Sequence, residues 1–499
     1  MANGARSLSI AIVATTPPRR WQARLAAAIE RDGHAVALEF ASSKSAPSQG
    51  LALLLEMERL AYGARPGAFE KDRVPANDAR NGAPYAVVID LRDSPEIRDG
   101  SGHTLVPLFD GVPGESALIA ALLDKRAPEI GIARWGETPQ IVARGLPVLE
   151  SPNIISYGLD QVLARVEDLL CQCVRRIVRG EEPIGKPVSR RSRSSSPAAL
   201  FAISGLAGKI TQRLTQLAVH PEHWRIAYRQ PADDPTIERG AWPDAPWTSL
   251  PDDLQRYFAD PFPFVAAGRT YIFCEEYPYA TRKGVISLFE IIDGRPTTPR
   301  PILERPYHLS YPFVFRQGAN IYMIPETSAV GRIELYRAES FPDRWTFERV
   351  LVHDIVASDA TLVTWQGRDW LFASIAGEGA STWDALGLFY ADHLFAEWRP
   401  HPLNPVLIDA GAARPGGAMV PMNGRLRRVA QDCRAMYGGG IVIADVDRLD
   451  PEDYAQTVRA VLGPPAGLRA RGAHTLNTAQ GLEIIDVVGP VRRSRSLRQ

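Results

Sequence analysis

The chain has 499 residues, with 57 basic and 57 acidic side chains. This length predicts two or three domains, and the balanced charge excludes a general attraction to nucleic acid or to an anionic membrane. Four cysteines, two of them in Cys171-x-Cys173, are too few for a disulfide framework or a zinc site. This cysteine usage indicates a reducing compartment and no metal site. GxGxxG and GxxxxGK[ST] motifs are absent, so we expect no cofactor.

Residues 7–185 alternate strand-like runs with helical stretches. The strand-like runs are SLSIAIVA, AVALEFA, YAVVIDL and EIGIAR. This alternation predicts an open α/β sheet with crossover helices. We interpret the N-terminal run as a first strand rather than a signal peptide, and no stretch approaches the ~20 apolar residues of a membrane span. These features predict a soluble, cytoplasmic protein, with peripheral membrane contact and the oligomeric state left open.

A Ser/Arg-rich segment, PVSRRSRSSSPAA, follows the α/β region and cannot bury apolar surface. We expect a linker over residues 186–200 and a connecting helix over 201–222, with Leu206, Ile210 and Leu214 on one face. Basic residues gather at 190–193 and in a C-terminal tail, residues 491–499. Such runs are usually solvated, although they also suit anionic lipid or phosphate.

From residue 223 to about 490 the chain consists of short strands broken by Gly, Pro and Asp. Five units share one pattern, an apolar strand, a tight turn and a returning strand, and their turn glycines are Gly268, Gly318, Gly367, Gly424 and Gly481. The spacings of 50, 49, 57 and 57 residues predict a five-bladed β-propeller rather than an irregular β-sandwich. We expect the strand HWRIAYR, residues 223–229, to close the ring by pairing with the last blade.

Polar residues recur at fixed distances from these glycines. Eight residues before a turn glycine lie Asp260, Ser310 and Asp359, and eight residues after one lie Glu276, Glu326 and Asp432. In a propeller these two registers emerge on the same face, so the acids should converge on one mouth of the channel. Carboxylates accept hydrogen bonds from hydroxyl groups and divide acid and base roles, which suits a sugar. The alternative for each acid taken alone is a solvated strand end.

Other side chains near these registers complete the predicted site. The aromatic residues Tyr257, Tyr277, Tyr311 and Trp383 offer apolar faces for sugar rings. The residues that we expect to bind the sugar are Tyr311, His308, Arg414, Gln431, Asp432, Arg434, His474 and Asn477.

The unit FADPFPFVAAGRTYIF resembles the first blade of the five-bladed propellers of glycoside hydrolase family 43. The resemblance implies that Asp260 is the general base and that Asp359, in ASDATLV, is the acid that positions the substrate. The family's general-acid Glu should begin the fourth unit, where this chain has AARPGGAMV with Arg414. Another carboxylate, Glu276, Glu326 or Asp432, then has to supply the proton, or the site does no hydrolysis.

Residues 224–490 resemble more closely the N-terminal domain of plant glucosamine inositolphosphorylceramide transferases. The shared stretches occur in order and are DPFPF, YPFVF…IPET, SDATLV, RPGG, QDC…YGGG and HTLN. In those proteins this domain precedes a separate glycosyltransferase domain, which has no counterpart in these 499 residues. The resemblance implies a glycan or glycolipid context rather than a particular reaction.

The N-terminal stretch FDGVPGESALIAALLDKRAPEIGIA resembles a formyltransferase N-terminal domain. Formyl transfer in that family needs an Asn–His pair and a downstream Asp. Neither HTLVPLF nor RWGETPQIVARG supplies them, and His103 and Asp110 are the nearest substitutes, in the wrong order. The resemblance therefore implies a catalytically degenerate relative.

Three hypotheses follow. The first is a carbohydrate-active protein of glycan or glycolipid synthesis or processing, with Asp260 as base or anchor, Asp359 as positioning acid, and Glu326 or Glu276 as proton donor. The second is a glycan-binding module without catalysis. The third is a formyltransferase acting on an amino sugar, against which the missing catalytic set argues.

Overall fold

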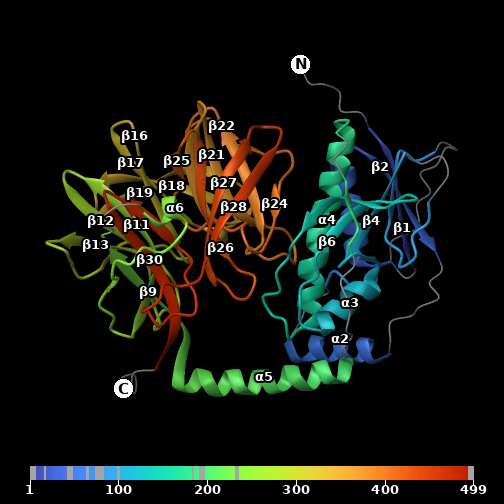
Figure 1. Cartoon of the computed structure of the whole chain (residues 1–499), viewed down its shortest axis with the longest axis horizontal. Helices are drawn as coiled ribbons and strands as arrows, with labels where there is room; N and C mark the ends of the chain where they lie inside the picture. The colour runs from blue at the N-terminus through green and yellow to red at the C-terminus, as the bar shows by residue number, and fades with distance from the viewer. Residues whose placement is uncertain are drawn as a thin grey trace. The chain divides into compact units, whose positions relative to one another are not determined.

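The computed structural model describes residues 7–15, 18–41, 49–62, 67–72, 84–97, 102–181, 185–189, 197–230 and 235–492. They form two compact units, and the boundary along the chain falls between Ile210 and Thr211, inside helix α5 (Ala198–Ala218; Figure 1). Of the predicted linker and tail, residues 190–196 and 493–499 lie outside the described residues, as do the side chains of Leu206, Ile210 and Leu214.

The first unit is built on one mixed sheet with the strand order β2-β1-β3-β4-β6-β7-β8, and β5 (Val112–Pro113) pairs at the end of β4. Its other strands are β1 (Ser9–Thr15), β2 (Ala35–Ala41), β3 (Val87–Asp90), β4 (His103–Phe109), β6 (Ile130–Arg134), β7 (Gln140–Gly145) and β8 (Lys186–Pro187). The helices are α1 (Arg20–Arg31), α2 (Gln49–Tyr62), α3 (Glu115–Leu123) and α4 (Ile155–Val178).

The predicted α/β sheet is confirmed, but it is only half parallel. Strands β2, β1, β3 and β4 run parallel to one another, whereas the pairs β4–β6, β6–β7 and β7–β8 are antiparallel. The connection from β6 to β7 is a short hairpin, residues 135–139, and a hairpin can join only antiparallel strands. Lys186 and Pro187, predicted to begin the linker, instead form β8 at the edge of this sheet.

The second unit is the predicted five-bladed propeller, with each blade a separate sheet. The first blade is β11 (Arg256–Ala266), β12 (Arg269–Pro278), β13 (Val285–Ile292), β14 (Arg295–Pro296) and β15 (Arg300–Leu303). The second is β16 (Ser310–Gln317), β17 (Asn320–Glu326), β18 (Ile333–Ser340) and β19 (Arg344–Val352), with the 3₁₀ turn η1 (Ser328–Val330). The third is β20 (Val356–Trp365), β21 (Arg368–Ala376), β22 (Ala385–Ala391), β23 (Arg399–Pro400) and β24 (Leu407–Ile408).

The last two blades complete the ring. The fourth is β25 (Val420–Met422), β26 (Arg425–Asp432), β27 (Gly440–Leu449) and β28 (Tyr454–Leu462). The fifth combines β29 (Leu476–Ala479) and β30 (Leu482–Arg492) with β9 (Val219–Arg229) and β10 (Thr248–Ser249) from the start of the unit. Strand β9 pairs antiparallel with β30 and contains the predicted closing strand (Figure 1), so the ring closes by joining the two ends of the chain segment.

The first strands of the blades face one another about the axis. Strand β11 contacts β16 and β29, and β16 contacts β20. The apolar residues of each blade pack against the next blade, as Phe262, Tyr322, Leu335 and Leu371 do between the first three blades. Packing between blades therefore forms the core, and the inner strands direct polar side chains toward the axis. Among the described residues, no helix combines the length and apolar composition that crossing a bilayer requires.

Candidate functional site

Three inner strands carry the same irregularity at the start of the blade. In β11, β16 and β20 the strand pairing is interrupted by a bulge at residues 260–261, 311–312 and 359–360. The first bulge residue has a positive φ each time: 50° at Asp260, 44° at Tyr311 and 57° at Asp359. Because a bulge redirects the side chain, three blades turn a polar group toward the axis at matching positions.

The bulges correct the predicted register in the second blade. Counting from the turn glycine aligned Ser310 with Asp260, but the bulge shows that Tyr311 is its counterpart. In the first and third blades the glycine is the second residue of a two-residue turn, whereas Gly318 is the first residue of its turn. Counting from Gly318 is therefore displaced by one residue, which moves every side chain to the other face.

The same argument applies to the returning strands. Glu275 pairs with Ala259 and Glu326 with Ser310, in each case directly beside the bulge, whereas Glu276 lies one residue further along β12. Glu326 and Glu275 therefore share a register. The Glu276 side chain lies on the other face of β12, where it accepts hydrogen bonds from Arg256 at 2.5 Å and from the Ser287 hydroxyl at 2.6 Å.

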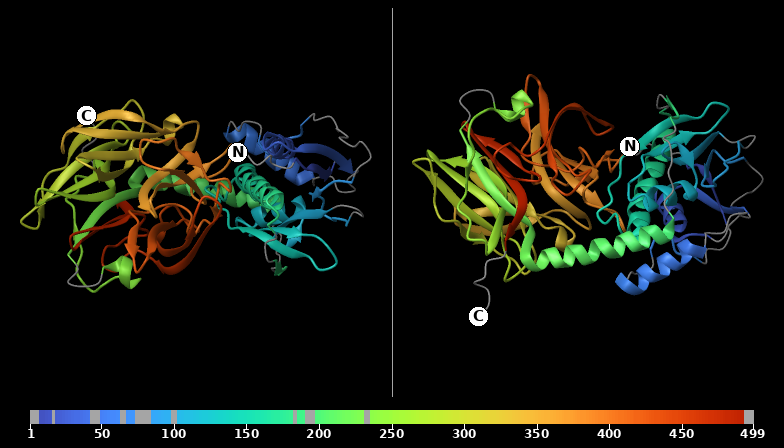
Figure 2. Two further views of the ribbon diagram at one scale, coloured as in Figure 1. Left: turned by 90° about the horizontal axis from the view of Figure 1, so that it is seen from above. Right: turned by 60° about the horizontal axis from the view of Figure 1, so that its bottom comes forward.

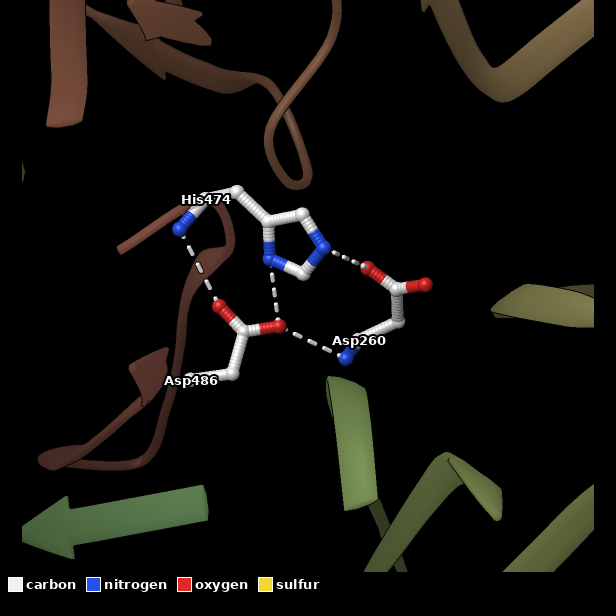
Figure 3. A group of neighbouring side chains, drawn as sticks. All are labelled: Asp260, His474 and Asp486. Carbon is white, nitrogen blue, oxygen red and sulfur yellow. Dashed lines mark hydrogen bonds and ion pairs between the residues drawn. The ribbon is translucent and has the colours of Figure 1, made fainter. Parts of the chain in front are cut away.

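Asp260 belongs to a buried network with His474 and Asp486 (Figure 3). Nδ1 of His474 lies 2.6 Å from Oδ2 of Asp486, and its Nε2 lies 3.5 Å from Oδ1 of Asp260. The backbone amide of Asp260 also donates to Asp486 at 2.8 Å. The two Asp260 oxygens accept hydrogen bonds from the Thr475 hydroxyl at 2.9 Å and the Tyr311 amide at 3.2 Å. The position and rotamer of Asp260 are thus fixed from two neighbouring blades.

The electrostatics of this network favour one arrangement of protons. Burial acts to lower the pKa of His474, but the carboxylates of Asp486 and Asp260 outweigh it and raise that pKa above its usual value. Burial raises the pKa of Asp260, and the neighbouring His474 opposes that shift. The imidazole therefore carries its proton more readily than a free histidine and holds it between two carboxylates.

In the described part of the chain, Asp260, His474 and Asp486 are the one group of three His, Asp, Glu or Cys side chains close enough to hold a metal, with ligand atoms within 4.8 Å of one another. Asp486 already accepts from the His474 ring, from the Asp260 amide and from the amides of His474 and Thr475 at 3.2 and 2.9 Å. An ionised carboxylate has about four acceptor sites, so these four donors occupy all of those of Asp486. Hydrogen bonding therefore accounts for the group without a metal.

Asp359 forms a second network with Arg414 and Gln431. Its Oδ2 lies 2.7 Å from Nε of Arg414 and accepts a hydrogen bond from the Gln431 amide at 2.9 Å. Arg414 also reaches Glu326, 3.8 Å away, and donates to the Tyr437 hydroxyl at 3.2 Å. Burial raises the pKa of Asp359, and Arg414 opposes that shift. Arg414 thus lies within ion-pair distance of two carboxylates, Asp359 and Glu326.

Glu275 lies in the same cluster although we predicted its neighbour. It is buried, and its Oε1 lies 3.4 Å from the Tyr257 hydroxyl and 3.3 Å from Nε2 of His308. Burial and the charges of Asp260 and Glu326 raise the pKa of Glu275 well above its usual value. Nδ1 of the partly exposed His308 accepts from the Gly284 amide at 3.0 Å, which leaves Nε2 as the donor to Glu275. Glu275 therefore holds a proton more readily than an ordinary glutamic acid.

Four other predicted residues have different surroundings. Tyr311 is fully buried, and its hydroxyl contacts Thr361 at 2.9 Å and accepts from the Gly417 amide at 2.8 Å. Asn477 is also buried and bridges Pro261 and Ala418 with hydrogen bonds of 2.9 and 2.7 Å. Both side chains are buried, and their hydrogen bonds join different blades. Asp432 and Arg434 pair with each other at 2.7 Å, and Arg434 is exposed.

Aromatic rings border the acid cluster. Trp224 stacks on His474, with 3.9 Å between ring centroids, and Tyr437 meets the same imidazole edge-on at 5.3 Å. Trp383 lies 5.3 Å from Tyr437, and both are half-buried. On the other side Tyr257 stacks on Tyr277 at 4.7 Å. The apolar faces of a sugar ring pack well on such rings, and the acids beside them accept hydrogen bonds from its hydroxyl groups.

Sequence reasoning missed Asp486, Trp224, Tyr437 and the role of Glu275. Asp486 had a signal, because LEIIDVVG places two acids, Glu483 and Asp486, inside an otherwise apolar strand, and buried acids require partners. Trp224 lies in the closing strand, more than 200 residues from His474, so only the ring closure brings it to the mouth.

In the first unit, His103 and Asp110 do not form a pair. His103 begins β4 and Asp110 follows its last residue, so the seven-residue strand separates them by about 20 Å. Asp110 is buried and accepts from Arg126 at 2.5 Å and from the Glu129 amide at 3.1 Å. The structure thus places the two nearest substitutes for the formyltransferase residues at opposite ends of one strand.

Comparison with known proteins agrees with the resemblance of the propeller. Residues 248–477 match the family model described as "Glucosamine inositolphosphorylceramide transferase 1, N-terminal". The curated protein of that name from Arabidopsis thaliana is 35% identical over 233 residues, which cover 44% of this chain and 30% of the relative. The japonica rice protein is 33% identical over 222 residues, with the same coverage. The matched part is therefore about a third of the length of these relatives.

Solved structures with a similar backbone include glycoside hydrolases. A family 117 glycoside hydrolase from Zobellia galactanivorans shares 13% identity at a TM-score of 0.35, covering 54% of this chain and 90% of that one. The beta-xylosidase RS223 shares 12% identity at a TM-score of 0.35, covering 47% and 93%. A family 43 beta-xylosidase/alpha-arabinofuranosidase from a compost metagenome shares 14% identity at a TM-score of 0.34, covering 48% and 92%.

Proposed function

We propose that the mouth of the propeller binds a sugar of a glycan or glycolipid, and that the protein acts in glycan or glycolipid synthesis or processing. One observation carries the proposal. Three blades deliver Asp260, Glu275, Glu326 and Asp359 to a single cluster, in which the charge of one carboxylate raises the pKa of another. Clustering acids in this way costs stability, and such costs are typical of functional sites.

The similarity to the plant transferases supports the choice of ligand. The matched residues 248–477 contain all four acids together with His308, Arg414 and His474. The name of those relatives joins glucosamine, an amino sugar, with inositolphosphorylceramide, a lipid that carries an inositol phosphate. Amino sugars and inositol phosphates are therefore the first ligands to test.

If the site is catalytic, the roles follow from the surroundings of each carboxyl group. Asp260, oriented by Thr475 and Tyr311, is the base or the anchor for a hydroxyl group. Glu275, whose pKa is raised, is the proton donor, and it joins Glu326 as a candidate for that role. Asp359, paired with Arg414, positions the substrate. Two carboxyl groups in different protonation states are the requirement for transfer or hydrolysis of a glycoside.

One observation favours a second candidate, a glycan-binding module without turnover. Arg414 stands where the resembled hydrolases have their acid, and it pairs with Asp359 at 2.7 Å. A carboxylate in a close ion pair is a poor proton donor, although it remains a good acceptor for a sugar hydroxyl. Binding without any turnover is the outcome that this second candidate predicts.

Calorimetry with glucosamine, inositol phosphate and a panel of neutral sugars tests the site. Glu275→Gln should weaken binding at least tenfold, whereas Glu276→Gln should leave it unchanged, because Glu276 contacts Arg256 and Ser287 on the other face of β12. Asp260→Asn provides a second variant in the cluster. Binding that survives both Glu275→Gln and Asp260→Asn would place the sugar elsewhere and contradict the proposal. Aryl glycosides and nucleotide-sugar donors, offered to the wild type, then separate an enzyme from a module.

A further inference from the structure

The first unit contains a cavity at the end of the sheet where β4, β6 and β7 stop pairing with one another. These strands lie side by side (Figure 2), and their last pairs at this end are Leu105 with Arg134 and Arg134 with Gln140. Beyond these pairs the Trp135 amide donates to the Thr104 carbonyl at 2.8 Å. The cavity has a volume of about 320 Å³. Small-molecule sites in proteins span ~300–1,000 Å³, so the cavity is large enough for a small ligand.

The position of the cavity differs from the usual ligand site of this class of fold. Open α/β sheets generally hold ligands beyond the carboxyl ends of their parallel strands. His103, which lines the cavity, is instead the first residue of β4 and lies at the amino end of that strand. The cavity is therefore separate from the site that the α/β architecture alone would suggest.

Two apolar side chains form walls of the cavity. The Trp135 ring packs, partly buried, against Val106, Leu108 and Ala133 on one face of the sheet, and this packing holds the ring in place. Ile97 also lines the cavity and is 55% exposed, so it leaves apolar surface that a ligand can cover. An indole and an aliphatic side chain in one cavity suit a flat aromatic ring, because such a ring packs well on both.

The charged part of the lining is basic. Arg134 donates from Nη2 to Oε1 of Gln140 at 3.4 Å, which orients its guanidinium beside the cavity. His103 adds an imidazole, which can donate a hydrogen bond in either protonation state. The residues that line the cavity all belong to the described part of the chain and include no Asp or Glu, and Glu137 of the adjoining hairpin is exposed. An anion is therefore the complementary ligand, and the planar fork of an arginine matches phosphate oxygens in particular.

We propose that this cavity of the first unit binds a nucleoside phosphate, with the base against Trp135 and Ile97 and the phosphate at Arg134. The two parts of the lining decide the class of ligand. Inorganic phosphate would leave the apolar walls uncovered, and a neutral sugar would make no use of the positive charge. The proposal goes beyond the sugar site, because no residue of the propeller takes part. It also gives His103 a role in binding rather than in formyl transfer.

Calorimetry with the full-length protein tests the proposal. The probes are adenosine monophosphate, uridine monophosphate, adenosine, ribose 5-phosphate and inorganic phosphate. At least one of the two nucleotides should bind at least tenfold more tightly than adenosine, which lacks the charge, because a charge-assisted hydrogen bond to arginine contributes this much. The same nucleotide should also bind more tightly than ribose 5-phosphate, which lacks the aromatic ring.

Two variants separate the two parts of the lining. Arg134→Gln should weaken binding of the nucleotide at least tenfold, since it removes the charge that faces the phosphate. Ile97→Ser should weaken it at least threefold, since the base then covers less apolar surface. Ile97 is more than half exposed, so this second variant should fold as the wild type does.

A matched control lies on the neighbouring strand β7, where Arg144 pairs with Glu129 at 2.8 Å and does not line the cavity. Arg144→Gln should bind the nucleotide as the wild type does. Glu275→Gln should do the same, because Glu275 belongs to the sugar site of the propeller. Circular dichroism confirms that each variant is folded.

Three results would overturn the proposal. The first is that neither nucleotide binds, or that binding survives both Arg134→Gln and Ile97→Ser. The second is that inorganic phosphate binds as tightly as the nucleotides, which would indicate a simple anion site. The third is that adenosine binds as tightly as adenosine monophosphate, which would leave Arg134 without a role in binding.

Discussion

Asp486, fully buried on β30, lies 2.6 Å from Nδ1 of His474 and so fixes the direction of the imidazole. The opposite ring atom, Nε2, then points toward Asp260. The first carboxylate of the predicted site is thus oriented by a histidine that is itself oriented by a second carboxylate. Removing Asp486 should therefore affect Asp260 although Asp486 lies outside residues 248–477, the range that matches the family model.

Asp486→Asn should lower the pKa of His474. An asparagine preserves the shape but removes the negative charge that opposes the desolvation of the imidazolium. NMR titration of the His474 ring protons measures the shift, and His308, which contacts Glu275 instead, is the internal reference. An unchanged His474 titration in Asp486→Asn would show that Asp486 does not stabilise the charged imidazole.

The raised pKa of His474 also predicts how stability depends on pH. Because the folded-state pKa lies above the unfolded value of about 6.5, this histidine stabilises the fold fully below that value. The contribution is lost as the pH rises through the folded-state pKa. Urea unfolding of the wild type between pH 5.5 and 9 should show this decline. His474→Gln should make the profile flatter over the same range, and an equal slope in both proteins would contradict the assignment.

Much of the fold could be predicted because its signals are local and repeated. Turn glycines at spacings of 49 to 57 residues predicted five blades, and a lone strand before the first unit predicted ring closure. The mixed character of the first sheet could not be predicted, because the hairpin between β6 and β7 has no Asn-Gly or Asp-Gly signal.

The register of the polar residues was displaced by one residue in two places. Ser310 was aligned with Asp260 instead of Tyr311, because Gly318 is the first residue of its two-residue turn whereas Gly268 is the second. The same displacement aligned Glu276, instead of its neighbour Glu275 on β12, with Glu326. A shift of one residue decides which face a strand side chain takes. Pro261 and Pro312 mark the first two bulges, because a strand interior tolerates proline mainly at a bulge, whereas the third bulge, in DAT, has no such signal. Long-range partners such as Trp224 become visible only in the closed ring.

Arg414→Met should destabilise the propeller by about 3–5 kcal/mol, the usual cost of leaving one buried charge without its partner. Arg414 is buried, and removing it takes away the cation that lies 2.7 Å from Asp359. The hydrogen bond from the Gln431 amide to Asp359 would remain, but this neutral donor does not balance the charge. The double variant Arg414→Met/Asp359→Asn removes the charge and should recover part of the loss. Urea denaturation of the wild type, Arg414→Met, Asp359→Asn and the double variant gives the coupling energy of the pair. If the losses in the two single variants add up to the loss in the double variant, the pair does not interact.

Tyr311→Phe should lower the free energy of unfolding by about 1–3 kcal/mol, because the Gly417 amide and the Thr361 hydroxyl lose a buried partner. Sugar binding should change little, since the Tyr311 side chain is fully buried and does not reach solvent. Thermal unfolding and calorimetry on the same variant separate the two effects. A large loss of affinity for the sugar, with an unchanged free energy of unfolding, would show instead that Tyr311 binds the sugar, as the sequence analysis expected.

Closure of the ring depends on a buried ion pair between β9 and β30. Arg229 donates to Oε2 of Glu483 from Nε at 2.9 Å and from Nη2 at 2.7 Å, and both side chains are buried. Glu483 also accepts from the Thr236 amide, which ties the loop after β9 to the same carboxylate. Arg229→Ala should therefore cost about 3–5 kcal/mol, because it leaves the Glu483 charge buried without its cation.

The exposed pair of Arg300 and Asp343, also in close contact at 2.6 Å, provides the control. Arg300→Ala should cost no more than about 1 kcal/mol, since solvent screens an exposed pair. Hydrogen exchange of the β9 and β30 amides in Arg229→Ala shows whether the loss is local. Faster exchange confined to the fifth blade is the expected result, because β9 is the strand that joins the ends of the propeller. Equal losses in the two variants would mean that burial of the closing pair contributes nothing.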